Sequence, residues 1–145
     1  MSVKVCDRKQ GKLETLTIAM QFACHTIRVC DNDNVFPKRH RLSVTADIIK
    51  NAKQLPKIIN RANKCELRKD HDERRRLQKE AIDLIDDLEI DLQIAYMSLS
   101  PNIKEQKLDY WIGLLVDARS KLRSWIKADE RELKTTSVSL IQVSS

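Results

Sequence analysis

Residues 108–127, LDYWIGLLVDARSKLRSWIK, indicate the architecture of this chain. Their apolar side chains recur every three or four positions, at Leu108, Trp111, Leu115, Ala118, Leu122 and Trp125. This spacing gathers them on one face of an α-helix, where they can be buried together as a seam. A second apolar stripe runs beside the seam and consists of Ile112, Val116 and Ile126. A helix with two apolar faces is expected to have neighbours on both, so we interpret the second stripe as a contact between subunits.

The rest of the chain predicts an all-α protein. Two glycines and three prolines in 145 residues are too few for an all-β fold, whose many turns use both residue types. The length suits one domain with one core. We predict an antiparallel up-down four-helix bundle over residues 1–133, with helices at about 12–30, 44–66, 70–98 and 101–132. The seam predicted for the third helix consists of Leu77, Ala81, Leu84, Leu88, Leu92, Ala95 and Leu99.

The two ends of the chain differ from the bundle in composition. Residues 1–10 show no helical period and are expected to form a short arm. The first helix then has its seam at Leu13, Leu16, Met20, Ala23 and Ile27. Residues 134–145, uncharged from Thr135 onward and rich in serine and threonine, are expected to form a flexible tail. A short strand that pairs with another chain is the alternative for this tail.

Two prolines shape the second helix and the segment before it. Pro37 disfavours helical backbone at Phe36. We therefore expect this segment to cross one end of the bundle, with Phe36 inserted as a plug. Pro56 lies inside the second helix, where a proline costs roughly 3 kcal/mol. Because the apolar spacing continues across Pro56, we predict one helix with a kink or bulge near Ala52–Pro56. The seam predicted for this helix consists of Val44, Ile48, Ala52, Leu55, Ile59 and Ala62.

Charge is distributed unevenly along the chain. Residues 1–79 carry 19 basic and 9 acidic residues, a net charge of +10, whereas residues 80–145 carry 8 and 12, a net charge of −4. The second helix holds cations at alternating spacings of three and four, which places them in one line: Lys50, Lys53, Lys57, Arg61, Lys64 and Arg68. We call these six residues the basic stripe. Arg39 and Arg41 lie just before it.

The basic stripe and these two arginines are the candidate nucleic-acid-binding or partner-binding residues. In one interpretation they bind phosphates, which makes the affinity steeply dependent on salt. In another they form a solvated face, or they face the acidic run Asp83, Asp86, Asp87, Glu89 and Asp91. No aromatic residue is interleaved with the stripe, so stacking of single-stranded bases is not predicted.

The sequence contains no recognisable catalytic or metal-binding motif. Metal-binding bundles use Glu-x-x-His pairs, and the chain has none. The histidines, His25, His40 and His71, do not share ligand spacing, and none of the four cysteines belongs to a Cys-x-x-Cys pair. No Gly-rich phosphate loop or nucleophile elbow is present. We therefore predict a non-enzymatic protein without metal or cofactor, with reduced thiols.

No stretch approaches the roughly 18 uncharged apolar residues of a membrane span. Residues 1–10 lack the basic-then-apolar pattern of a signal segment. A cytoplasmic location without membrane partners is expected.

Two segments carry a resemblance to a known family: FPKRHR at residues 36–41 and LRSWIKAD at 122–129. With these, the chain resembles the Avd family, the accessory variability determinants of diversity-generating retroelements, and the related proteins encoded by intervening sequences in bacterial 23S ribosomal RNA. The resemblance covers about residues 12–130 and is most specific at Phe36-Pro37-Lys38 and at Leu122 with Trp125-Ile126-Lys127. The arm, the uncharged tail and Pro56 depart from the family pattern.

The resemblance implies a function as well as a fold. Avd-like proteins are basic four-helix subunits that form barrel-shaped homopentamers, bind nucleic acid and associate with a reverse transcriptase. The expected role is therefore that of a non-catalytic accessory protein, which binds template RNA or cDNA and supports mutagenic cDNA synthesis by that polymerase. The residues themselves leave an alternative open, a helical protein–protein interaction module whose basic stripe meets an acidic partner surface without binding nucleic acid.

Overall fold

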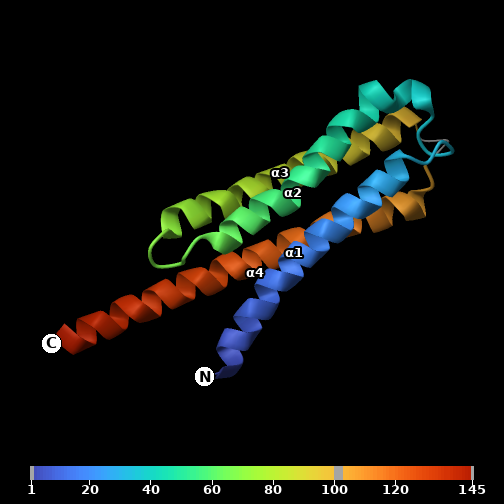
Figure 1. Ribbon diagram of the computed structural model, residues 1–145. Helices are drawn as coiled ribbons and strands as arrows, with labels where there is room; N and C mark the ends of the chain where they lie inside the picture. Colours follow the sequence, from blue (N-terminus) through green and yellow to red (C-terminus); the bar gives the residue numbers. More distant parts are fainter. Residues whose placement is uncertain (1, 100–102, 145) are drawn as a thin grey trace.

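A computed structural model of the chain describes residues 2–99 and 103–144, with side chains described for residues 13–39, 43–98 and 103–135. It consists of four α-helices: α1 (Ser2–Cys30), α2 (Ala46–Lys64), α3 (His71–Leu99) and α4 (Glu105–Ser144) (Figure 1). A 3₁₀ turn, η1 (Lys38–His40), and a π-helical turn, η2 (Arg41–Thr45), lead into α2. The residues described include no β-strand, so the predicted all-α class is confirmed.

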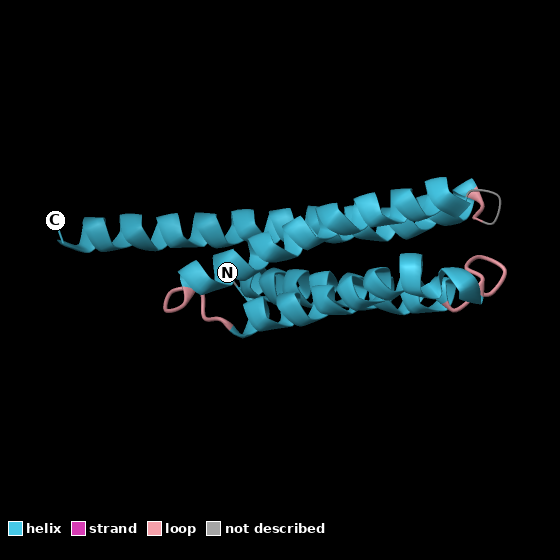
Figure 2. Cartoon of the chain, turned by 90° about the horizontal axis from the view of Figure 1, so that it is seen from above, coloured by secondary structure: helices cyan, strands magenta, loops and turns pink. Residues whose placement is uncertain are grey.

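Each helix packs against two others. The contacts join α1 to α2 and α4, and they join α3 to the same two helices. The segment that connects α1 to α2 lies at one end of the molecule, where α3 ends and α4 begins, and the α2–α3 loop lies at the other end with both chain termini (Figure 1). Figure 2 shows that the C-terminal part of α4 extends past the other helices.

The seam predicted for residues 108–125 is the centre of the core. All six of its side chains are buried, Leu108, Trp111, Leu115, Ala118, Leu122 and Trp125. On α2, the predicted positions Ile48, Ala52, Leu55, Ile59 and Ala62 are buried as well. Val44, the first position predicted for the second helix, is half-buried. On α3, Leu77, Ala81, Leu88, Leu92 and Ala95 are buried, and Ile85 takes the place expected for Leu84, which is half-buried. The side chain of Leu99, the last predicted position, lies outside the described residues. These three seams were therefore predicted almost entirely by periodicity.

The seam predicted for α1 is wrong at three of its five positions. Leu13, Met20 and Ile27 are 62%, 52% and 36% exposed, whereas Ala23 is buried and Leu16 is half-buried against the core. The buried face instead consists of Thr15, Ala19, Phe22, Ala23, Thr26 and Cys30. Its polar members are compatible with burial because they are hydrogen-bonded. The Trp111 Nε1–H donates to Thr26 Oγ1 at 2.9 Å, and that hydroxyl donates to the Phe22 carbonyl at 2.7 Å.

The first and last helices of the chain, α1 and α4, are longer than predicted. Helix α1 begins at Ser2, whereas the sequence predicted an arm there, and α4 continues to Ser144 through the expected tail, where a strand was the alternative. Serine, threonine and valine cost only a few tenths of a kcal/mol each in a helix, and no glycine or proline follows Gly113 to end α4. Gly11 lies inside α1 without ending it. The predicted helix start at residue 101 lies outside the described residues.

The connection before α2 contains the predicted plug. Phe36 is fully buried and meets the Trp111 ring edge-on, with ring centroids 6.3 Å apart and an interplanar angle of 73°. Helix α2 is continuous through Pro56, as expected. The irregular helical backbone lies earlier than predicted, in the π-helical turn Arg41–Thr45 rather than near Ala52–Pro56.

Candidate nucleic-acid interface

The basic stripe follows the outer face of α2, and its last member, Arg68, lies in the loop after the helix. The side chains of the stripe are exposed, while the apolar residues of α2 point into the bundle. From Lys50 to Lys64 the stripe covers 14 residue steps, or about 21 Å along the helix axis. Five of the stripe's cations lie on this length: Lys50, Lys53, Lys57, Arg61 and Lys64. They form a straight row with a cation about every 5 Å.

No acidic side chain among the described residues pairs with these five cations. Two acids of the α3 run point toward α4, because Arg119 binds Asp86 at 2.8 Å and Glu89 at 2.9 Å. Asp91 lies against α2 instead, beside Asp47 and Asn51. Within the described part of the chain, no ion pair joins this run to the five cations. A row of exposed like charges without counter-charges repels itself and attracts anions from solution.

The cations that follow the stripe in sequence behave differently. Arg75 binds Glu130 at 2.6 Å, and Arg76 binds Glu73 and Glu80 of its own helix at 2.6 and 3.1 Å. These two arginines are therefore compensated by acids, in contrast to the five cations of α2.

The remaining candidate residues lie at the two ends of the row. Arg39 is exposed in η1, ahead of α2, and Arg68 is exposed in the loop after it. Both make contacts within the chain. The side chain of Arg41 lies outside the described residues. Of the eight predicted binding residues, the structure thus brings together the five cations of α2 on one exposed face.

Carboxylates gather where α2 meets α3, at the side of the stripe. The pKa of Asp91 is raised by burial and by the nearby charges of Asp87 and Asp47, and a hydrogen bond with Asn51 opposes that rise. Within the described part of the chain, no group of three histidine, cysteine or acidic side chains could hold a metal ion.

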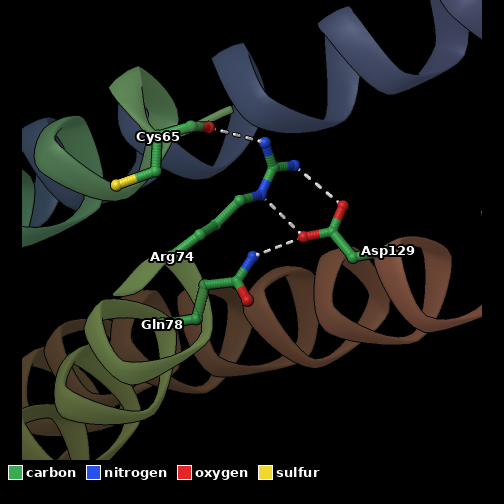
Figure 3. A network of polar contacts seen from close by, with 4 residues as sticks. All are labelled: Cys65, Arg74, Gln78 and Asp129. Carbon is green, nitrogen blue, oxygen red and sulfur yellow. Dashed lines mark hydrogen bonds and ion pairs between the residues drawn. The ribbon is translucent and has the colours of Figure 1, made fainter. Parts of the chain in front are cut away.

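A buried polar network fixes the end of α2 where the stripe finishes (Figure 3). The Arg74 guanidinium donates two hydrogen bonds to Asp129 of α4, each 2.8 Å long, and a third to the Cys65 carbonyl at 3.1 Å. Gln78 Nε2 donates to the same Asp129 carboxylate at 3.0 Å. Arg74 also lies over the Trp125 ring, 5.0 Å from its centroid. The network thereby joins α3, α4 and the first residue after α2.

Apolar spacing did not predict this network, although one sign of it is visible in the sequence. Asp129 follows Trp125 by four positions and so continues the buried seam of α4. An acidic residue on a seam needs a buried cation or several donors. Periodicity cannot show that the partner is Arg74, which is 55 positions away.

The predicted subunit contact is only partly exposed. Ile112 and Ile126 are half-buried, and Val116 is 42% exposed. The outward row on α1, Leu13, Met20 and Ile27, exposes more apolar surface than these three residues.

Comparison of the chain with models of known protein families, with curated proteins and with solved structures gives no match. None of the helices, as far as their residues are described, combines the length and the apolar character needed to cross a membrane.

Proposed function

We propose that this protein is a non-catalytic helical protein that binds nucleic acid through the basic stripe. The observation that carries the proposal is the row of five exposed cations on α2, none of which is paired with an acid among the described residues. Structural cations in this protein, such as Arg74 and Arg119, do have acidic partners. The row therefore has no evident role in holding the bundle together.

The size of the effect follows from the number of cations. Each neutralised phosphate of a duplex contributes about −0.9 to the slope of log affinity against log salt. Five contacts give a slope of about −4.5, so affinity falls by roughly 500-fold between 50 and 200 mM salt. Such a dependence is measurable with ordinary equilibrium binding.

We test the proposal by reversing two adjacent charges of the row. Lys57→Glu with Arg61→Glu is expected to abolish retention of RNA at moderate salt and to leave the circular dichroism spectrum unchanged, because both side chains are exposed. The matched control is Arg123→Glu with Lys127→Glu, an exposed pair with the same spacing on α4. If both double variants bind RNA like the wild type, the proposal fails.

The more detailed proposals come from the resemblance to the Avd family. On that basis we propose an antiparallel up-down bundle that assembles into a barrel-shaped homopentamer in the cytoplasm. It would act as an accessory of a retroelement reverse transcriptase and hold template RNA or cDNA during mutagenic synthesis. Co-purification with the polymerase, and the subunit number from light scattering, test these two points separately.

The exposed apolar surface supports self-association and suggests where to test it. Two variants each place a charge on an outward apolar row, Met20→Glu on α1 and Val116→Glu on α4. The variant that lowers the particle mass measured by light scattering identifies the row that forms the subunit contact. If neither changes the mass of an oligomeric wild type, both rows are excluded as that contact.

A second candidate function is a protein–protein interaction module. One observation favours it: between Leu13 and Ile27 the chain has a single charged residue, Glu14, and that side chain is paired with Lys121. Such a neutral outward face suits a protein neighbour. Tight protein binding by a chain that retains no RNA at low salt would favour this function over the first.

A further inference from the structure

We propose that the basic stripe takes a double-helical nucleic acid, held along its phosphate backbone, in preference to a single strand. This inference rests on the proposed function, that the stripe binds nucleic acid at all. Three features of the structure support it: the absence of stacking partners, the shape of the face, and the side chains that flank the cations.

The stripe offers no aromatic side chain for stacking. The sequence contains no phenylalanine, tyrosine or tryptophan between Phe36 and Tyr96. Both tryptophans and both phenylalanines are buried, and Tyr110 packs edge-on against His25 between α4 and α1, with ring centroids 4.9 Å apart. Proteins that bind single strands gain about 1–3 kcal/mol per base from aromatic stacking. That gain is absent here.

The shape of the face favours a stiff ligand. The cations stand in a straight row of about 21 Å on the convex side of a helix whose opposite side is buried. A single strand must be ordered to follow such a row, and without stacking nothing offsets the lost conformational freedom. A duplex is already stiff, with a persistence length of about 50 nm, and it presents its phosphates at fixed spacing. Its charge density is also higher, so each contact releases more counterions.

Amide side chains lie beside the row and suit a sugar–phosphate backbone. Asn60 is exposed and Gln54 is half-buried on α2. Asparagine and glutamine are common donors to phosphate and sugar oxygens, contacts that carry no sequence information. We therefore expect recognition by backbone, with little sequence preference.

The test compares labelled ligands by fluorescence anisotropy at one salt concentration. The probes are an RNA duplex of about two turns, the DNA duplex of the same sequence, a second duplex of unrelated sequence, and a polyuridine strand of equal length. At least one type of duplex is expected to bind about tenfold more tightly than polyuridine, and the two sequences are expected to bind with similar affinity. A single strand that binds as tightly as both duplexes overturns the inference and leaves the proposed function standing. If no probe binds, the proposed function itself fails.

Two matched double variants test whether the basic stripe is responsible for the preference for a duplex. Lys53→Gln with Lys57→Gln should reduce duplex affinity by about tenfold or more and bring it close to that for polyuridine. Arg123→Gln with Lys127→Gln should leave the duplex preference unchanged. If the stripe variant keeps the full preference for a duplex, another surface selects the ligand and the inference is wrong.

Discussion

Replacing Asp129 with alanine removes the acidic partner of an almost fully buried guanidinium. The side chains of Arg74 and Asp129 are 4% and 10% exposed, and they share two hydrogen bonds of 2.8 Å. In the variant, Arg74 keeps its hydrogen bond to the Cys65 carbonyl and its contact with the Trp125 ring, but it loses its counter-charge. Breaking such a buried pair from one side costs about 3–5 kcal/mol, because a charge is left without compensation.

The chain provides a control at the surface, another arginine–carboxylate pair between α3 and α4. Arg75 and Glu130 follow Arg74 and Asp129 by one position and form an ion pair of 2.6 Å, but their side chains are 50% and 40% exposed. Solvent screens this pair, so Glu130→Ala is expected to cost about 0–1 kcal/mol. Comparing the two alanine variants thus separates the effect of burial on stability from the effect of losing an ion pair.

Urea unfolding followed by circular dichroism, at one fixed protein concentration, gives the free energy of unfolding of each variant. Asp129→Ala should lie at least about 2 kcal/mol below Glu130→Ala. A third variant, Arg74→Met with Asp129→Leu, should recover most of the loss, because apolar side chains can replace a buried ion pair. Equal stabilities for the two alanine variants would refute the argument that this pair matters because it is buried.

Three further predictions follow from single side chains. Phe36→Ala should lower the free energy of unfolding by about 3–5 kcal/mol in urea titrations, because the plug is fully buried. Burial raises the pKa of Cys30 to about 12, so alkylation at pH 8, mapped by mass spectrometry, should modify exposed Cys24 before Cys30. Burial and the nearby charge of Asp87 raise the pKa of Asp91 in the folded protein. The ionised Asp91 carboxylate therefore destabilises the fold at pH values above the ordinary pKa of an aspartate. Asp91→Asn should raise the urea midpoint at pH 7, and this gain should shrink as pH falls through the raised pKa.

Apolar spacing in the sequence was sufficient to predict the buried face of a helix where the regularly spaced apolar residues are the buried ones. In α4 every seam position from Leu108 to Trp125 is buried, because the regular spacing of apolar residues holds them on the face toward the core. In α1 the largest aliphatic residues do not mark the core. Thr26 is buried there because its hydroxyl accepts from Trp111 and donates to the Phe22 carbonyl. That reason depends on another helix and cannot be read from spacing within α1.

The binding surface was predicted in part. Helical spacing placed Lys50 to Lys64 on one face, and their exposure follows from the buried seam on the opposite side of α2. Whether acids neutralise them depends on how α3 is turned. The structure shows that Asp86 and Glu89 bind Arg119 of α4. Contacts between side chains so far apart in sequence require the tertiary structure.

The central claim is that the uncompensated cations of α2 bind phosphates. Its most direct test is the slope of log affinity against log salt for a duplex, measured for the wild type and for a variant with Lys53→Gln, Lys57→Gln and Arg61→Gln. We predict a slope of about −4.5 for the wild type and about −1.8 for the variant, because three of five contacts are lost. A wild-type slope near zero, or a variant slope equal to that of the wild type, would contradict the claim.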